Sequence, residues 1–341
     1  MVVLMQFRRL LLALVALALM FGPALYIVYV DYQRFLDTPI DVPASGLVLA
    51  IKPGMGIADL TRELQRSPGV LRSALYLQTY ARLNGWAPRI KAGEYAIVPG
   101  TTPRSLIEQI VAGRVLQHAL TVVEGWTFRQ LRQALAAHPK IAQTLREASD
   151  AEIMARLGRP NQHPEGRFFP DTYHFPAGTP DEAFLKRALV VMDQRLAEAW
   201  GDRSPNLPLS DPYQALILAS IVEKETGLAA ERADIAGVLV RRLRNGMLLQ
   251  TDPTVIYGLG QAFDGNLRKQ DLIADTPYNT YTRKGLPPTP IALPGAAALK
   301  AAVNPASGDA LYFVANGAGG HIFSQTLDQH HQAVRQYQSK E

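Results

Sequence analysis

Two glutamates near the middle of the chain are the first candidates for chemistry. Residues 220–227 read SIVEKETG, and they follow the apolar run ALILA at 215–219. A carboxyl at the end of so apolar a segment loses solvation, and desolvation disfavours its charged form. A carboxyl that stays protonated near neutral pH is what a general acid requires. The question is whether Glu223 or Glu225 is such an acid.

One helix should carry both glutamates. Asp211 followed by Pro212 predicts a helix start, and Gly227 predicts its end. Residues two apart on a helix lie about 200° apart around its axis, so Glu223 and Glu225 cannot both line one cleft.

The helical spacing favours Glu225. Its side chain should lie over Leu218, Ile221 and Val222, the most apolar stripe of the helix. Burial and the negative end of the helix dipole should both raise the Glu225 pKa. The alternative is that Glu223 and Glu225 are ordinary exposed residues where a buried helix reaches the surface, and periodicity alone leaves that open.

The N-terminal region is typical of a membrane anchor. Residues 10–30 are 21 consecutive positions without a charge, enough to cross about 30 Å of hydrocarbon as a helix. Arg8 and Arg9 precede the stretch and Asp31 follows it, which favours a cytoplasmic N-terminus and an exported remainder. The alternative is a cleaved signal peptide, whose apolar stretch is usually shorter and ends in an A-x-A-like site.

The rest of the chain predicts an α+β protein. We expect a cytoplasmic stub and transmembrane helix at 1–31, a linker at 32–45, a small α+β unit at 46–117 and a mainly helical domain with short strands at 118–341. Helices of the last domain are expected at 127–137, 151–157, 181–200, 212–226 and 230–245. A hairpin is expected around the NGAGG segment near the C-terminus.

Composition removes several classes of function. The chain has no cysteine, which excludes disulfides, thiolate metal sites and a cysteine nucleophile. A net charge of +5 without an arginine-rich helix gives no sign of nucleic-acid binding. The neighbouring histidines His330 and His331 lack the spacing of a metal site. We expect no metal and no cofactor.

Longer motifs resemble one family. The segments 218–260 and 278–291 closely resemble the signature of the YceG-like endolytic murein transglycosylases of bacteria. The likeness extends through EGRFFPDTYHF at 165–175 and LYFVANGAGGHIF at 311–323, and upstream through KAGEY at 91–95 and VVEGWT at 122–127.

The resemblance implies an activity and an acid. It implies a membrane-anchored enzyme that cuts glycan strands between N-acetylmuramic acid and N-acetylglucosamine and leaves a 1,6-anhydromuramyl end, ending strand elongation. The second Glu of the EKE motif is the acid in that family, and it falls on Glu225. One carboxyl suffices where the muramyl 6-hydroxyl is the internal nucleophile, whereas hydrolases usually need two.

The same resemblance suggests a set of substrate-binding residues. Each also has a purely structural interpretation: a helix N-cap for Asp252, an Asx turn for Asn279, and core or cap positions for the others. The expected substrate-binding residues are Gln250, Asp252, Thr254, Tyr257, Tyr278, Asn279, Tyr281 and His321.

The resemblance also implies a LysM-like fold for 46–117, inner-membrane location with a periplasmic catalytic domain, and peptidoglycan glycan strands as partner. Peptidoglycan synthases of the penicillin-binding class are a further expected partner. Two departures stand out: Arg241 where the family commonly has Asn, and Thr289 where it commonly has Gly. Two other functions stay open, a non-catalytic peptidoglycan-binding scaffold for synthases and a true hydrolase using a second acid.

Overall fold

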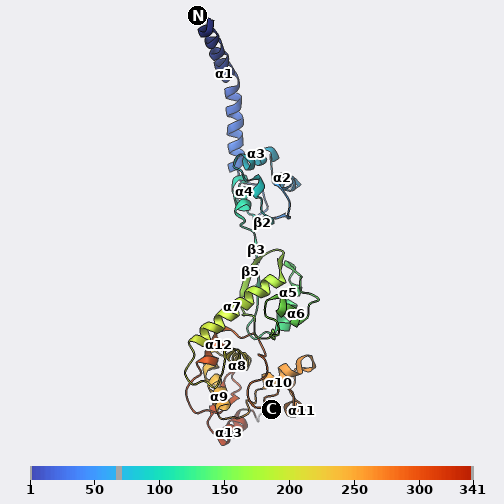
Figure 1. The fold of residues 1–341 in the computed structure, drawn as a ribbon, viewed down its shortest axis with the longest axis vertical. Coiled ribbons are helices and arrows are strands. Elements are labelled where there is room, and N and C mark those ends of the chain that lie inside the picture. The colour runs from blue at the N-terminus through green and yellow to red at the C-terminus, as the bar shows by residue number, and fades with distance from the viewer. Residues whose placement is uncertain (1, 67–70, 339–341) are drawn as a thin grey trace. The chain divides into compact units, whose positions relative to one another are not determined.

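The structure is a computed structural model that describes residues 2–66 and 71–338 (Figure 1). Two compact units make up the chain, and the division falls between His118 and Ala119. We call them the small unit and the large unit. Helices and short strands occur in both, and a long apolar helix opens the chain, which confirms the coarse fold prediction.

Over its described residues, the small unit combines one two-stranded antiparallel sheet with four helices and a short 3-10 turn. β1 and β2 pair from Leu47 with Ile97 to Ile51 with Gly93. Thr102 before Pro103, and Gly113, are local sequence signals for the two ends of a helix. Thr102 is the N-cap of the last helix of this unit, and Gly113 ends it in a left-handed conformation. The elements are α1 (Val2–Asp37), β1 (Leu47–Ile51), α2 (Ile57–Arg66), α3 (Ala74–Leu83), η1 (Ala87–Arg89), β2 (Gly93–Ile97) and α4 (Pro103–Ala112).

Helix α1 is longer than the sequence predicts. It runs without a break from the charge-free stretch to Asp37, so the first part of the segment expected to be a linker, 32–45, is helical instead. Phe35, Leu36 and Ile40 are buried in the core of the small unit. The linker interpretation is therefore wrong for these residues, because their apolar side chains complete a core. By length and composition, Gln6–Asp37 is one helix of the described chain that could span a membrane.

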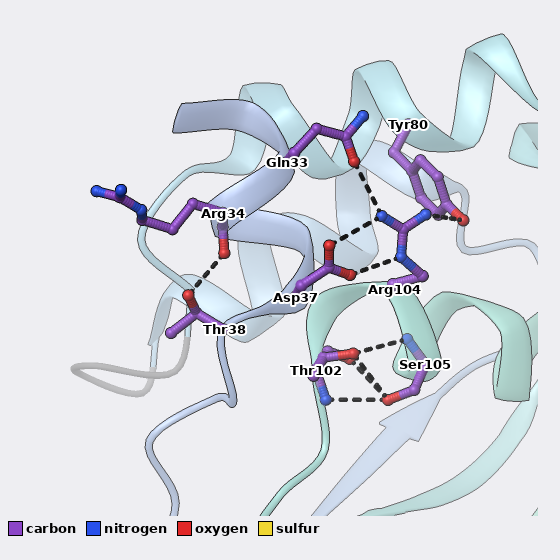
Figure 2. Close-up of polar contacts among 8 residues, drawn as sticks. All are labelled: Gln33, Arg34, Asp37, Thr38, Tyr80, Thr102, Arg104 and Ser105. Atoms are coloured by element: carbon purple, nitrogen blue, oxygen red, sulfur yellow. Dashed lines mark hydrogen bonds and ion pairs between the residues drawn. The ribbon is translucent and has the colours of Figure 1, made fainter. Parts of the chain in front are cut away.

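A polar cluster fixes the end of α1 to the small unit (Figure 2). The Arg104 guanidinium donates to Asp37 Oδ1 at 2.8 Å and Oδ2 at 3.3 Å, and to Gln33 Oε1 at 3.1 Å. It also donates to the Tyr80 hydroxyl at 3.3 Å and lies over the Tyr80 ring. One residue of α4 thus ties α1 and α3 together.

The large unit is mainly helical, with three two-stranded sheets. β3 lies across the division and pairs with β5, β4 and β6 run parallel, and β7 and β8 form an antiparallel hairpin. The elements are β3 (Gln117–Thr121), α5 (Phe128–Ala137), β4 (Ile141–Ala142), α6 (Asp150–Arg156), β5 (Thr172–Pro176), β6 (Thr179–Pro180), α7 (Asp181–Gly201), α8 (Pro212–Glu225), η2 (Ala229–Glu231), α9 (Arg232–Arg244), α10 (Asp252–Leu259), η3 (Gly260–Ala262), α11 (Lys269–Ile273), α12 (Ala296–Val303), β7 (Tyr312–Ala315), β8 (His321–Ser324) and α13 (Leu327–Tyr337).

Two apolar clusters build the large unit. One lies around α5, α6, β5 and α7. The other surrounds α8 with residues of α7, α9 and α12. The hairpin around NGAGG is confirmed, with Asn316 accepting backbone N–H bonds from Ala318 and Gly320 in its turn. Helix α8, which carries the two candidate glutamates, therefore lies at the centre of a core.

Candidate functional site

Helix α8 begins as the sequence predicts. The Asp211 carboxylate accepts a bond from Gln214 N at 2.9 Å, and Pro212 is the first helical residue. The helix ends at Glu225, and the extended Thr226 forms the C-cap. The Thr226 hydroxyl then accepts from Leu228 N at 3.0 Å. Glu225 is thus the last residue of a buried helix.

Burial alone does not separate the two glutamates. Every residue from 215 to 222 is buried, so the stripe beneath Glu223 is as buried as the stripe beneath Glu225. The more apolar stripe beneath Glu225 therefore does not by itself make this carboxyl the more desolvated one. Burial raises the pKa of both carboxyls.

Partners separate the two glutamates. The Glu223 carboxylate accepts from Gly295 N at 2.9 Å and pairs with Arg232 at 3.3 Å, and its side chain is 5% exposed. These contacts tie α8 to the start of α12 and to α9. Glu223 therefore has a structural role.

Glu225 lacks such partners. Among the described residues, no hydrogen bond or ion pair reaches its carboxyl. Burial, and next the negative charge of Asp252, raise its pKa to about 8, against the opposing charge of Arg242. Glu225 therefore carries a proton near neutral pH and has a free hydrogen-bonding group to offer.

A tyrosine and an acid lie close to Glu225. The Tyr281 hydroxyl donates a short hydrogen bond to Asp252 Oδ1. Burial and then this bond raise the Tyr281 pKa, and the charge of Glu225 acts in the same direction. Asp252 is the first residue of α10, whose N-cap is Thr251, so the alternative interpretation of Asp252 as a helix N-cap is wrong.

The charge of Arg242 acts on Glu225, and backbone carbonyls hold its guanidinium in place. It is 7% exposed, and its guanidinium donates to Leu311 O at 2.7 Å and to Leu249 O at 2.8 Å. It also donates to Gln250 Oε1 at 3.2 Å. Gln250 has a φ of 52°, a strained value for a residue with a side chain. Gln250 lies at the site, but its side-chain oxygen already has a protein partner.

Two predicted substrate-binding residues lie inside the protein. Thr254 is fully buried, and its hydroxyl donates to Thr251 O at 2.7 Å. Asn279 is also fully buried: its amide donates to three carbonyls, and its Oδ1 accepts from Tyr281 N at 2.8 Å. That contact is the Asx turn which the sequence left as the alternative. Both side chains hold the loops of the site instead of facing a ligand.

Tyr257 and Tyr278 lie together, on a cavity of about 800 Å³ within the large unit. Their ring centroids are 4.9 Å apart at an angle of 63°. Lys224 and Pro253, the chain neighbours of Glu225 and Asp252, also line this cavity. The predicted tyrosines therefore form a wall beside the Glu225 site.

His321 is bound to Glu231 beside the turn of the hairpin. Its Nδ1 is 2.8 Å from Glu231 Oε2, and its backbone N donates to Glu231 Oε1 at 2.9 Å. These contacts join the hairpin to η2. His321 therefore serves the hairpin attachment in this structure.

Sequence reasoning missed Glu165. This residue is 3% exposed and lines the same cavity as Tyr257. Burial raises its pKa to about 7. The next residue, Gly166, has a φ of 79°, and an added Cβ would lie 2.5 Å from Pro290 Cβ. The available signal in the sequence was an acid followed directly by a glycine and, one residue later, by the apolar segment FFP at 168–170. This pattern could have marked Glu165 as a buried acid.

Comparison with known proteins identifies the family of this chain. A model of the YceG-like family matches residues 49–336. A Bacillus subtilis (strain 168) protein named endolytic murein transglycosylase is 31% identical over 326 residues, which cover 90% of this chain and 89% of that relative. The chain therefore belongs to the YceG-like family.

Two further relatives support the assignment. A Streptococcus pneumoniae serotype 2 protein, also named endolytic murein transglycosylase, is 27% identical over 347 residues, and this chain spans only 61% of its length. A crystal structure of a YceG-like protein from Listeria monocytogenes is 29% identical with a TM-score of 0.57, covering 85% of this chain and 99% of that one.

Proposed function

We propose that this chain is a membrane-anchored lytic transglycosylase that cuts peptidoglycan glycan strands internally. Family membership and the names of the bacillar and streptococcal relatives support the reaction class. The observation that carries the proposal is the Glu225 carboxyl, which has a pKa of about 8 and no protein partner within the described chain.

Glu225 acts first as acid and then as base. Its carboxyl gives a proton to the oxygen that joins C1 of N-acetylmuramic acid to N-acetylglucosamine, and the C1–oxygen bond breaks. The carboxylate then takes the proton of the muramyl 6-hydroxyl while O6 bonds to C1. One product ends in a 1,6-anhydro ring and the other in a free 4-hydroxyl, so no water is consumed.

Neighbouring groups prepare Glu225 for this cycle. The negative charge of Asp252 keeps the acid protonated, and Arg242 limits the rise so that the carboxylate formed after the first step is stabilised. The substrate's N-acetyl group stabilises the positive charge at C1. Tyr281, Tyr257 and Tyr278 supply hydroxyls and ring faces for the sugar, while Thr254 and Asn279 support the loops.

Product analysis tests the reaction. The full-length protein is incubated with purified peptidoglycan, and the released fragments are analysed by mass. Anhydro ends support the proposal, and reducing ends indicate a hydrolase. Absence of release indicates the non-catalytic scaffold.

The N-terminal helix suggests the location. Gln6–Asp37 is long and apolar enough to span a bilayer, and the charges around it favour a cytoplasmic N-terminus with the large unit in the periplasm. The inner membrane, where strands are polymerised, is the proposed location, and ending of strand growth is the proposed role. Peptidoglycan synthases of the penicillin-binding class are the matching partners.

The small unit is proposed to be LysM-like. Its paired strands β1 and β2, with α2 to α4, match the expected two-strand pattern. The proposed role of the small unit is to bind glycan weakly and to space the large unit from the membrane. Glycan binding by the small unit can be tested with full-length protein that carries Glu225→Gln. Its affinity for peptide-free glycan strands is measured with and without substitutions on the small unit.

A further inference from the structure

The cavity that Tyr257 and Tyr278 line draws its walls from several separate stretches of the large unit. The lining residues used below are Phe128, Glu165, Lys224, Tyr257 and Tyr278. Its volume of about 800 Å³ is in the range of ligand sites. Aromatic rings and a few hydrogen-bonding groups together are what binds the apolar faces and hydroxyls of sugars.

Glu165 fixes one ring of the cavity. Its Oε1 accepts from Phe128 N at 2.9 Å, and its Oε2 is 3.1 Å from the donating hydroxyl of Tyr257. No ion pair reaches Glu165 within the described residues. A carboxyl 3% exposed is expensive to bury, so its place is explained by the contacts that it makes.

Thr289 fixes the second ring. The Tyr278 hydroxyl lies 2.9 Å from Thr289 Oγ1. The Thr289 hydroxyl donates its own proton to Pro290 O at 2.8 Å. Thr289 therefore accepts from Tyr278. At Gly258 an added Cβ would lie 3.1 Å from Tyr278 Cβ, so this tyrosine also packs closely on α10.

Lys224 and Pro253 line the cavity, and they are the chain neighbours of Glu225 and Asp252. Asp252 and Tyr257 are on the same helix, α10, five residues and therefore about 7.5 Å apart along its axis. A glycan strand with its scissile bond at Glu225 would extend its next sugars along α10 into the cavity.

We propose that this cavity is a saccharide subsite, in which Glu165 and Thr289 are positioning residues that set the rings of Tyr257 and Tyr278 against the strand. This inference rests on the proposed function for its ligand class. Without the Thr289 hydroxyl, Tyr278 would lose this contact, and the subsite should hold the strand less tightly.

Binding without turnover tests the subsite. Full-length protein carrying Glu225→Gln is titrated with glycan strands freed of their peptides by an amidase. Adding Thr289→Gly should raise the Kd about five- to tenfold, the value of one hydrogen bond. Thr289→Ser keeps the hydroxyl and should stay within about twofold.

Glu165 supplies an independent pair of variants. Glu165→Gln keeps an acceptor for Phe128 N and a donor for Tyr257, so it should bind like its parent. Glu165→Leu loses both and should weaken binding about tenfold or more. Glu198→Leu, on the exposed face of α7, controls for loss of a charge.

The active enzyme gives the second readout. In the background with Glu225 intact, Thr289→Gly should raise KM while kcat stays within about twofold. A fall in kcat at unchanged KM would overturn the positioning role. If Glu165→Leu does not fold, Thr289→Gly decides.

The two proposals can fail separately. Strands that bind the Glu225→Gln protein equally well with and without Thr289→Gly overturn the subsite, as does absence of binding. Tight, Thr289-dependent binding by a protein that releases no anhydro ends would leave the subsite standing and defeat the proposed reaction.

Discussion

Two ionisable groups, one in each unit, have contrasting surroundings. In the small unit, the half-buried Arg104 is surrounded by acceptors on Asp37, Gln33 and Tyr80, and hydrogen bonds raise its pKa. In the large unit, Glu225 is left without a partner in the described chain. A paired charge stabilises a fold, whereas an unpaired carboxyl retains its reactivity.

The same contrast recurs within α8. Glu223 and Glu225 lie two residues apart and are both desolvated, yet only Glu223 is bound, by Arg232 and Gly295. Burial identifies a carboxyl as a candidate general acid, and the absence of a hydrogen-bonding or ionic partner distinguishes Glu225 from Glu223.

The largest effect should come from Glu225→Gln. Glutamine is nearly the same size but cannot donate a proton in this way, so the rate of anhydro-product release should fall on the order of 10³-fold. The matched variant Glu223→Gln should keep most of the activity, because its partners are structural. Equal losses in both variants would remove the distinction between the glutamates.

Leu36→Ala should show that α1 belongs to the small unit. Leu36 is fully buried, so truncation should reduce the unfolding free energy of that unit by about 2–5 kcal/mol. Amide hydrogen exchange of the full-length protein should speed up in α3 and α4 and stay unchanged in α8. Val48→Ala, at an exposed position, is the control. Unchanged exchange in α3 and α4 would mean that the helix is only loosely attached.

Stability should depend on pH in the large unit. The pKa of Glu225 is raised from 4.5 to about 8, so between these values the folded protein binds more protons than the unfolded one. The unfolding free energy should therefore fall as pH rises from about 4.5 through about 8, by about 1–3 kcal/mol. Urea unfolding at both ends of the range measures this, and a Glu225→Gln variant with the same slope would assign the effect to other groups.

Activity should follow the same group. Only the protonated form of Glu225 is a general acid, so the rate should decline through about pH 8 and then about tenfold for each further pH unit. Initial rates of anhydro-end formation from pH 6 to 10 provide the profile. A rate that stays flat to pH 10 would mean that Glu225 is not the acid.

Arg104→Ala should have the smallest effect. Its contacts are partly exposed, so the loss should lower the Tm of the small unit by roughly 4–8 °C. Arg104→Lys cannot form the paired bonds to Asp37, so its Tm should lie between those of Arg104→Ala and the unaltered protein. Calorimetry of the full-length protein reports both values. No change in either would show that the buried apolar residues of α1 suffice.

Local signals predicted much of the fold. Asp211-Pro212 marked the start of α8, Thr102-Pro103 and Gly113 marked both ends of α4, and the NGAGG segment marked the hairpin. These are contacts between residues close in sequence. The extension of α1 into the small unit was missed because it depends on packing with α3 and α4, far along the chain.

The site was predicted in part for the same reason. Glu225 was found from helical spacing and from motifs, but the face argument was incomplete, since burial of α8 on all sides depends on α7, α9 and α12. Thr254 and Asn279 were placed toward a ligand because a sequence does not show which hydroxyls and amides have found partners. Glu165 was missed because its contacts with Phe128 and Tyr257 lie 37 and 92 residues away.

Because α1 is one unbroken helix, its charge-free stretch and the small unit rotate together about the helix axis. Residues 31–37 extend the helix by about 10 Å beyond the charge-free stretch, and the unit's own core grips that extension. An alanine inserted after Val30 would turn the small unit by about 100° around the helix axis and shift it by about 1.5 Å. The rotation of the small unit about this helix is therefore set by the number of residues between the charge-free stretch and Phe35.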